Sequence, residues 1–261
     1  SCWGPNGRVT KYPGTYSSPA AAGDGGFCTV ERNSGKIVCK DVSGQLQNGI
    51  PSGKYLSLTV GKGTAPSAQF ACAQSRSSTG ATLDCWGANG QGQASPPAGT
   101  QFKRVSAGDG FACAVKVDGS LFCWGQTEGL EKVPKGRNFN DVHSGLEHAC
   151  AIKRDGSAIC WGKNGSEDFG ELSAPSGPWR RVFTGAHHNC GTYSGSRKVR
   201  CWGSNHDGES MRRSKSSFAA TTIDVGGRVG CGVVGNGKLR CWGASFACQP
   251  TGPVGYVEGK N

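Results

Sequence analysis

Several features that mark other classes of protein are missing from this chain of 261 residues, or scarce in it. The sequence contains no apolar run long enough to span a membrane and no basic segment followed by an apolar leader. We therefore expect no membrane span. The chain is interpreted as a soluble protein or an ectodomain from which any signal peptide has been removed.

Histidine is scarce, and its positions favour neither a metal site nor catalysis. The five histidines are His143, His148, His187, His188 and His206. None stands with cysteine at the spacing of zinc ligands, and none matches the spacing of a known catalytic triad. If every cysteine is paired, no free thiol nucleophile remains. We therefore expect a protein that is not an enzyme and that has no metal and no cofactor.

Acidic residues are few, so the chain is strongly basic. It has 18 Asp and Glu against 29 Lys and Arg, a formal net charge of +11 and a pI near 9.1. More than half of this excess lies between Pro178 and Lys215. The candidate binding residues are the cations of this segment: Arg180, Arg181, Arg197, Lys198, Arg200, Arg212, Arg213 and Lys215. Such a patch attracts anionic partners, although solvated cations that bind nothing give the same pattern.

Cysteine, by contrast, is abundant and regularly spaced. The tripeptide Cys-Trp-Gly occurs six times and once becomes Cys-Lys-Asp, and these seven copies recur every 37 to 46 residues. Their cysteines are Cys2, Cys39, Cys85, Cys123, Cys160, Cys201 and Cys241. A second cysteine precedes six of them by 10, 11 or 13 residues, at Cys28, Cys72, Cys113, Cys150, Cys190 and Cys231. A repeat of this length is typical of a propeller or a solenoid.

Each cysteine pair is predicted to join the two strands of a β-hairpin. In residues 111–125 an alternating, β-rich run is broken by Asp118-Gly119, which is a strong hairpin signal. If Cys113 faces Cys123, a three-residue turn is left, with its glycine in the left-handed position. The same count predicts turns at 154–156 and 235–237. Directly opposed residues lie about 4.5 to 5.5 Å apart, a distance that a disulfide can span.

We therefore predict six cross-strand disulfides and a seventh that joins the two ends of the chain. The six are Cys28–Cys39, Cys72–Cys85, Cys113–Cys123, Cys150–Cys160, Cys190–Cys201 and Cys231–Cys241. The segment 245–248 repeats the Phe-Ala-Cys of two other copies, so Cys248 is expected to pair with Cys2. In the chain-entropy model this terminal bridge stabilises the fold by about 5 kcal/mol, against roughly 3 kcal/mol for each hairpin bridge.

A further strand in each repeat begins with an aromatic or bulky residue, as at 139–142 and 179–182, where it follows a Pro-x-Gly turn. Each repeat then holds three or four short strands, which cannot bury both faces alone and must stack on their neighbours. We predict an all-β chain that forms a single β-propeller domain over residues 1–261. Seven blades are favoured, six of them complete and one shared by the two termini. Six blades are the alternative.

The fourteen cysteines, which divide into pairs, indicate that the chain matured in an oxidising compartment. We expect a secreted or cell-surface protein. Asn164-Gly-Ser166 is an acceptor motif in a polar loop, so Asn164 is a candidate glycosylation site. Nucleic acid is not an expected partner, because this compartment disfavours it and aromatic residues do not alternate with basic ones outside structural positions.

The repeat resembles that of a known superfamily. It consists of an aromatic residue with Ala-Cys-Ala, then Asp-Gly-Ser, then Cys-Trp-Gly-x-Asn, and it looks like the repeat of the regulator-of-chromosome-condensation superfamily. The chain is most similar to the secreted, cysteine-stapled branch, which includes the ectodomains of plant crinkly-type receptor kinases. The resemblance implies seven repeats with a cysteine pair in each. It does not imply one function, because the superfamily also includes nuclear exchange factors and an inhibitor of β-lactamases.

The tryptophans of the repeat are interpreted as packing residues, because equivalent positions in every copy more often pack between blades than bind a ligand. Trp179 is interpreted in the same way, since Phe102 and Phe139 are its counterparts. Function is then expected where the copies differ. We predict a secreted, non-catalytic, lectin-like recognition module that binds an acidic glycan or an acidic protein through its basic face. The alternatives are an inhibitor of a secreted enzyme and the ligand-binding ectodomain of a receptor.

Overall fold

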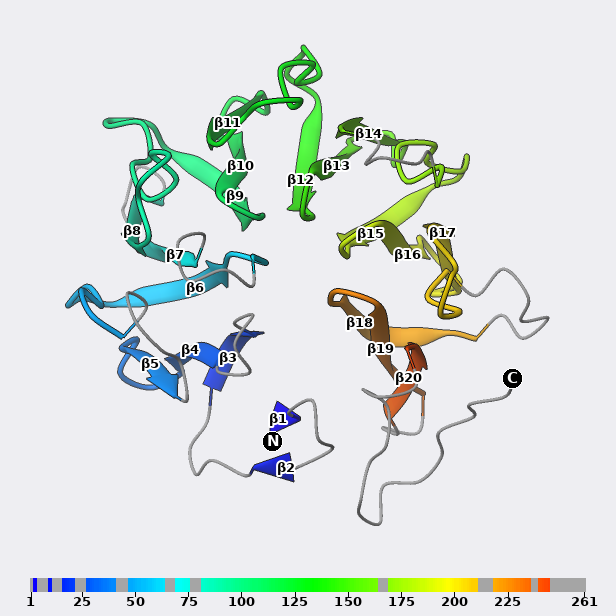
Figure 1. The fold of residues 1–261 in the computed structure, drawn as a ribbon, viewed down its shortest axis with the longest axis horizontal. Helices are drawn as coiled ribbons and strands as arrows, with labels where there is room; N and C mark the ends of the chain where they lie inside the picture. Colours follow the sequence, from blue (N-terminus) through cyan, green and yellow to red (C-terminus); the bar gives the residue numbers. More distant parts are fainter. Residues whose placement is uncertain are drawn as a thin grey trace. The chain divides into compact units, whose positions relative to one another are not determined.

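Short antiparallel strands make up the regular structure of the chain. The computed structural model describes residues 2–3, 9–10, 16–21, 27–40, 47–63, 69–75, 81–163, 169–210, 218–235 and 239–244. Within these ranges there are twenty strands and no helix. The strands form six three-stranded sheets and one two-stranded sheet (Figure 1). Each three-stranded sheet corresponds to one complete repeat of the sequence and is called a blade below.

The blades follow one another along the chain. The strands are β1 (Cys2–Trp3), β2 (Val9–Thr10), β3 (Tyr16–Ala21), β4 (Phe27–Glu31), β5 (Ile37–Lys40), β6 (Tyr55–Val60), β7 (Phe70–Ser75), β8 (Leu83–Gly87), β9 (Phe102–Ala107), β10 (Phe111–Lys116), β11 (Leu121–Gly125), β12 (Phe139–Ser144), β13 (His148–Lys153), β14 (Ala158–Gly162), β15 (Trp179–Thr184), β16 (His188–Tyr193), β17 (Val199–Gly203), β18 (Ala220–Val225), β19 (Val229–Val234) and β20 (Leu239–Gly243). In every blade the middle strand carries the first cysteine and the third strand carries the second.

The chain divides into two compact units. Unit 1 comprises Ser1–Lys11 and His143–Asn261, and unit 2 comprises Tyr12–Val142. In unit 2, β6 packs against β3 and β4, and β9 packs against β6 and β7. In unit 1, β15 packs against β13, and β18 packs against β15 and β16. Neighbouring blades within each unit therefore bury one another's faces, while the single domain over residues 1–261 stays a prediction.

The hairpins have the predicted register and the predicted bridges. In all six blades the two cysteines lie directly opposite each other and form a disulfide, with Cα atoms 4.0–4.1 Å apart. In the β10–β11 turn, the backbone N–H of Lys116 donates to the carbonyl of Ser120 at 2.8 Å, and Gly119 has φ 87°. Asp118 Oδ1 accepts hydrogen bonds from the amide and the hydroxyl of Ser120. The turn residues thus have the structural role that the sequence indicates.

The tips of five hairpins also bind the first strand of the next blade. The carbonyl of Gly119 accepts the backbone N–H of Phe139 at 3.0 Å, and that of Gly156 accepts the N–H of Trp179 at 2.8 Å. The same bond joins Gly35 to Tyr55, Ala81 to Phe102 and Arg197 to Ala220. The hairpins therefore fix the position of the following strand as well as closing their own blade.

Predictions about the two ends of the chain fall partly outside the described residues. β1 pairs with β2, with Cys2 opposite Thr10 and Trp3 opposite Val9. Cys248 and residues 236 and 237 of the third predicted turn lie outside the described ranges. The Cys2–Cys248 bridge and the seventh blade therefore stay predictions.

Candidate functional site

The first strand of a blade presents two consecutive solvent-facing side chains. In β15, buried Trp179 and Val182 flank two exposed residues, Arg180 and Arg181. Strict alternation would turn one of these side chains inward, but a β-bulge between Trp179 and Arg181 adds one residue. β6, β9 and β18 have a bulge at the same place, with Leu56-Ser57, Lys103-Arg104 and Thr221-Thr222. One scaffold thus presents a different pair of side chains in each of these blades.

Arg180 and Arg181 line a groove between β15 and β18. The groove has a volume of about 220 Å³ and is lined also by Phe183, Thr192, Thr221, Thr222 and Ile223. It contains two cations, three hydroxyls and two apolar side chains, and no acidic residue lines it. Among the described residues, no carboxylate forms an ion pair with either arginine. The groove can therefore accept negative charge together with hydrogen-bond acceptors.

The described cations of the predicted patch do not form one surface. Arg180, Arg181, Arg197, Lys198 and Arg200 are all exposed. Arg181 lies opposite Thr192 and Arg200 lies opposite Gly191, so the alternation of side chains places Arg181 and Arg200 on opposite faces of the blade. Arg200 Nη1 donates to the hydroxyl of Tyr193 at 3.0 Å, away from the groove. Arg212, Arg213 and Lys215 lie outside the described residues, as does Asn164.

The tryptophans of the repeat pack between blades, as predicted. Four of them are buried, at 4–7% exposure: Trp86, Trp124, Trp161 and Trp202. The indole N–H of Trp124 donates to the carbonyl of Gln93, which follows the preceding blade, at 3.0 Å. Trp202 and Trp242 make the same bond to Glu171 and Glu209, also at 3.0 Å. These rings are therefore unavailable as a row of sugar-stacking platforms.

Trp179 is a packing residue as well. Its ring stacks on Tyr193 with centroids 4.4 Å apart, and its indole N–H donates to the carbonyl of Pro175 at 2.9 Å. The side chain is 3% exposed. Trp179 therefore supports the bulge that carries Arg180 and Arg181 without facing solvent itself.

Two of the five histidines are buried where other blades have phenylalanine. His148 begins β13 and His188 begins β16, the positions of Phe70 and Phe111 in β7 and β10. His148 Nε2 lies 2.9 Å from Asn189 Oδ1, and Asn189 Nδ2 donates to the carbonyl of Glu171 at 2.8 Å. Because Asn189 Oδ1 is an acceptor, His148 Nε2 is the donor. This polar connection between two blades was not predicted from the sequence.

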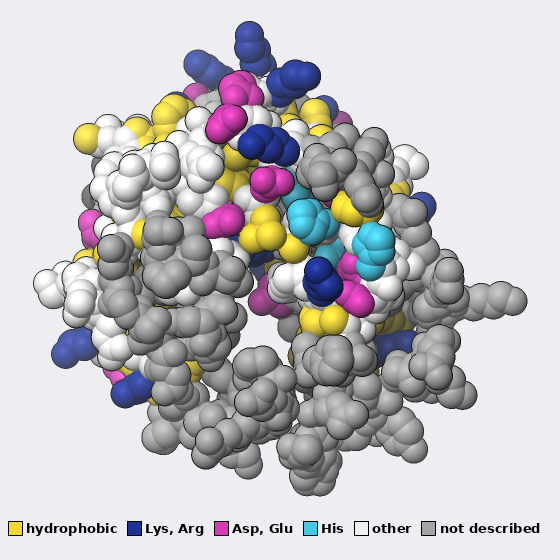
Figure 2. Space-filling model, viewed as in Figure 1, with side chains coloured by type: hydrophobic (Ala, Val, Ile, Leu, Met, Phe, Trp, Pro, Cys, Tyr) yellow, Lys and Arg dark blue, Asp and Glu magenta, His cyan; other side chains and the backbone are white. Residues whose placement is uncertain are grey.

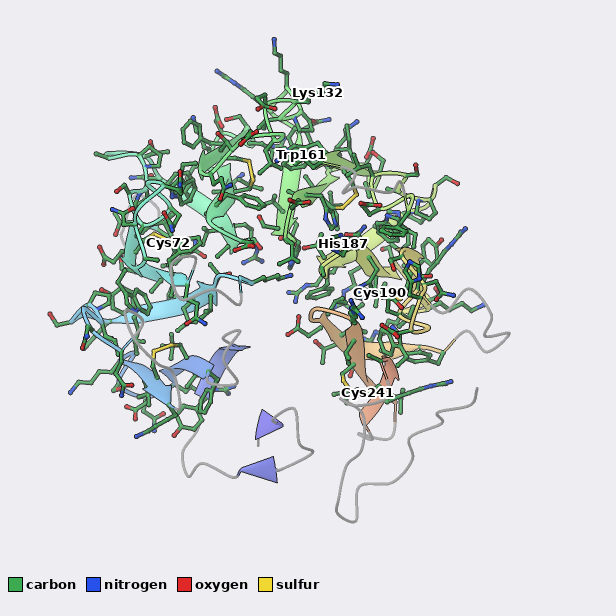
Figure 3. The ribbon with its side chains drawn as sticks, in the orientation of Figure 1. Cys72, Lys132, Trp161, His187, Cys190 and Cys241 are labelled. Atoms are coloured by element: carbon green, nitrogen blue, oxygen red, sulfur yellow. A yellow bond between two sulfur atoms is a disulfide. The ribbon has the colours of Figure 1, made fainter. Side chains whose placement is uncertain are left out.

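Two other histidines lie against an aromatic side chain. The ring of Phe169 lies 5.2 Å from His206 and 6.1 Å from His187, which is labelled in Figure 3. Arg228 Nη1 forms an ion pair with Asp207 at 3.3 Å in the same loops of unit 1. Among the described residues, no group of three or more His, Cys, Asp or Glu side chains is arranged to hold a metal ion.

Glu209, one of the two acidic residues in the loop after β17, has a structural role. Burial raises the pKa of its carboxyl, but hydrogen bonds from the Ser204 hydroxyl and the Asp207 amide outweigh this effect. With the charge of His188 they hold the pKa below its usual value of 4.5. The two hydrogen bonds are 2.6 and 2.7 Å long. Glu209 is therefore a charged anchor for its loop, and no acid–base function follows from it.

Two stretches of the chain match a family model, the regulator of chromosome condensation (RCC1) repeat. They are residues 102–128 and 139–167, which contain the β9–β11 blade and the β12–β14 blade. Together with the repeated three-stranded sheets and one disulfide per blade, the match defines the class: the chain is an all-β protein with the fold of an RCC1-type propeller. The resemblance inferred from the Cys-Trp-Gly repeat is therefore confirmed.

Solved structures of crinkly-type ectodomains and of an RCC1-type protein are similar to this chain. The chain is similar to the entire ectodomain of receptor kinase CR4 from Physcomitrella patens, with TM-score 0.68 and 21% identity over 84% of this chain and 59% of that one. It is also similar to the CRINKLY WD40 ectodomain of ACR4 from Arabidopsis thaliana, with TM-score 0.67 and 25% identity over 89% and 80%. Prp20p from Saccharomyces cerevisiae gives TM-score 0.57 and 15% identity over 73% and 57%.

The chain spans less than two thirds of the CR4 ectodomain that it matches. The solved structures named above are two ectodomains of receptor kinases and one RCC1-type protein. In the part of the chain that the structure describes, no helix is long and apolar enough to cross a membrane.

Proposed function

We propose that the chain is an extracellular, non-catalytic recognition module that binds an acidic ligand in the groove between β15 and β18. The observation that carries the proposal is the pair Arg180 and Arg181, held exposed by a bulge beside the hydroxyls of Thr221 and Thr222. Two guanidinium groups offer up to ten N–H donors in fixed planes, which suit carboxylate or sulfate oxygens. The similarity to crinkly-type ectodomains supports a ligand-binding role of this kind.

The six disulfides and the ectodomain likeness support an extracellular location. Each hairpin of the described blades is closed by a cystine, and such bridges persist in oxidising environments. We expect the groove to be rigid, because each of the two blades that form it is cross-linked internally by a disulfide. A rigid site loses little conformational entropy when a ligand binds.

A strained backbone in the same blade adds support. Arg197 is the one non-glycine residue with positive φ, 54°, in the described part of the chain. Residues held in such conformations cluster at functional sites. Arg197 and Lys198 add exposed positive charge at the β16–β17 turn of the same blade, which would speed the approach of an anionic partner.

An acidic protein segment is the first ligand class to test, and an acidic glycan is the second. Prp20p, which shares the fold, has binding properties toward proteins, namely Gsp1p and histones. No similar observation favours a glycan, and the buried tryptophans remove the usual stacking platforms. The ligand-binding ectodomain therefore becomes the main hypothesis, and enzyme inhibition has no specific support.

The test compares the chain with a variant that carries Arg180→Ala and Arg181→Ala. Fluorescence polarisation with labelled oligoglutamate, and an array of sulfated and uronic-acid glycans, measure the two ligand classes. We expect the double variant to weaken binding of the preferred class about tenfold, because two charge-assisted contacts are lost. Binding should also weaken as ionic strength rises.

The matched control is the variant Lys103→Ala and Arg104→Ala. It removes the same charge from the corresponding bulge positions of β9. If the groove is the site, this control retains most of the affinity. An equal loss in both variants would mean that net charge, and not the groove, attracts the ligand, and would overturn the proposal.

A further inference from the structure

A second groove lies in unit 2, where the β10–β11 hairpin meets the loop before β12. Its volume is about 490 Å³. One side is the hairpin, from Lys116 to Leu121, and the other is the loop segment Val133–Arg137. Figure 2 shows Lys and Arg side chains projecting from the region of this loop, and Figure 3 labels Lys132 there. This groove shares no residue with the one between β15 and β18.

The lining combines an apolar base with a cationic rim. Leu121 is buried, and Val133 and Pro134 are half-buried. Lys135 and Arg137 are exposed, and Lys116 is half-buried with its Nζ 4.9 Å from the ring centroid of Phe122. Three cations thus surround a strip of apolar surface. A groove of this composition suits a ligand that carries both negative charge and an apolar side chain.

The one acidic residue of the groove leaves its cations largely available. Asp118 Oδ1 accepts two hydrogen bonds from Ser120, and its Oδ2 lies 3.4 Å from Arg137 Nε. That contact uses one of the five N–H donors of the guanidinium, and the pair is exposed to solvent. The hydrogen bonds from Ser120 and the charges of Arg137 and Lys116 lower the pKa of Asp118, so it stays ionised and orients Arg137.

The lining of this groove differs from the equivalent surface of the next blade. The β13–β14 hairpin has the same turn, with Lys153 and Asp155 in place of Lys116 and Asp118. Its facing loop, however, reads Ala-Pro-Ser-Gly-Pro at 174–178, where the first reads Val-Pro-Lys-Gly-Arg at 133–137. Only the scaffold is repeated, while the cations of the loop are not. A difference of this kind is expected of a recognition surface and is not needed to build the blade.

An exposed apolar side chain stands beside the groove. Val117 is 44% exposed at the hairpin tip, between the lining residues Lys116 and Asp118. A large apolar side chain held in solvent at a rigid turn adds contact area for an extended partner.

We propose that this groove binds an acidic peptide segment of a partner protein, with an apolar side chain of the segment seated on Leu121, Val133 and Pro134. The glutamates or aspartates on either side then meet Lys116, Lys135 and Arg137. Charge complementarity sets the sign of the ligand, and the apolar strip selects a peptide over a polar glycan. The site is independent of the proposed function, because it lies in different blades.

The probe is a fluorescein-labelled peptide of Glu-Glu-Leu repeats, with a glutamate-only peptide and a heparin-derived oligosaccharide for comparison. The test variant carries Lys135→Ala and Arg137→Ala, two exposed positions whose replacement leaves the buried core unchanged. We expect it to weaken binding of the Leu-containing peptide about tenfold, as measured by polarisation. The glutamate-only peptide should bind severalfold more weakly to the unaltered protein.

Two control variants locate the effect. Lys153→Ala with Arg154→Ala removes the same charge beside the loop that lacks cations, and Arg180→Ala with Arg181→Ala removes it from the other groove. Both should keep the affinity for the Leu-containing peptide within about twofold. Equal losses in all three variants, equal binding of the two peptides, or binding of the oligosaccharide alone would each overturn the inference. If the Arg180→Ala and Arg181→Ala variant still binds the ligand of the groove between β15 and β18, that result contradicts the proposed function only.

Discussion

In four blades a single turn residue with a left-handed backbone carries the carbonyl that bonds to the first strand of the next blade. Three of these residues are Gly35, Gly119 and Gly156, with φ of 72°, 87° and 82°. Arg197 does the same with φ 54° and bonds to Ala220. A side chain in this region costs about 1–2 kcal/mol.

Replacing Arg197 by glycine should therefore stabilise the protein. The relief of strain exceeds the extra chain entropy of glycine in the unfolded state, so Arg197→Gly should raise the free energy of unfolding by about 0.5–1 kcal/mol. Urea unfolding with the disulfides intact measures it. The reverse change, Gly119→Ala, should cost about 1 kcal/mol. A loss of stability in Arg197→Gly would show that the arginine side chain holds the turn.

At the scale of elements, one pair of blades is joined by a polar contact where others have an apolar one. His148 at the start of β13 bonds to Asn189 at the start of β16, whereas β7 and β10 begin with Phe-Ala at 70–71 and 111–112. Both side chains are buried, at 1% and 0% exposure. The two polar residues therefore depend on each other, since a buried polar group without a partner costs free energy.

A double-mutant cycle should reveal this dependence. Asn189→Ala alone removes the hydrogen bonds that Asn189 makes with His148 Nε2 and with the Glu171 carbonyl, and should cost about 1–3 kcal/mol of stability. The pair His148→Phe and Asn189→Ala recreates the sequence of the other blades and should recover most of that loss. The free energies of unfolding of the four proteins give the coupling. Additive effects would show that the contact contributes nothing, and His206→Ala, an exposed histidine, serves as the control.

The sequence predicts those elements whose geometry follows from the number of residues between two positions in one hairpin. The turn at Asp118-Gly119 and the Cys113–Cys123 bridge follow from the separation of two cysteines in one hairpin, and both are present. The bulge at Arg180 is different, because one extra residue in a strand cannot be recognised from the sequence when both it and its neighbour are polar. The His148–Asn189 bond joins residues 41 positions apart, and the groove beside Pro134 depends on which loop a hairpin faces. Those features come from tertiary packing.

At the scale of the whole molecule, the cystines fall into two kinds. The six that the structure describes close loops of 10, 11 or 13 residues. Each acts within one blade and leaves the order of the blades to packing between faces. A bridge between Cys2 and Cys248 would instead connect the first strand to the last repeat, and would restrict the unfolded chain along nearly its entire length.

The two kinds should differ in energy as well as in position. Loop-closure entropy grows with loop length, so removing Cys2 and Cys248 as a serine pair should cost about 5 kcal/mol, and removing Cys113 and Cys123 about 3 kcal/mol. Peptide mapping under non-reducing conditions first establishes whether Cys2 and Cys248 are joined, and urea unfolding of the two double variants then compares their stabilities. If Cys2 is found joined to another cysteine, the shared seventh blade is wrong. Another outcome is that the bridge is present and yet costs no more to remove than a hairpin bridge. The two ends of the chain would then already be close together in the unfolded ensemble, or the bridge would be strained in the folded protein. In either case, closure by the termini would not be what stabilises this propeller.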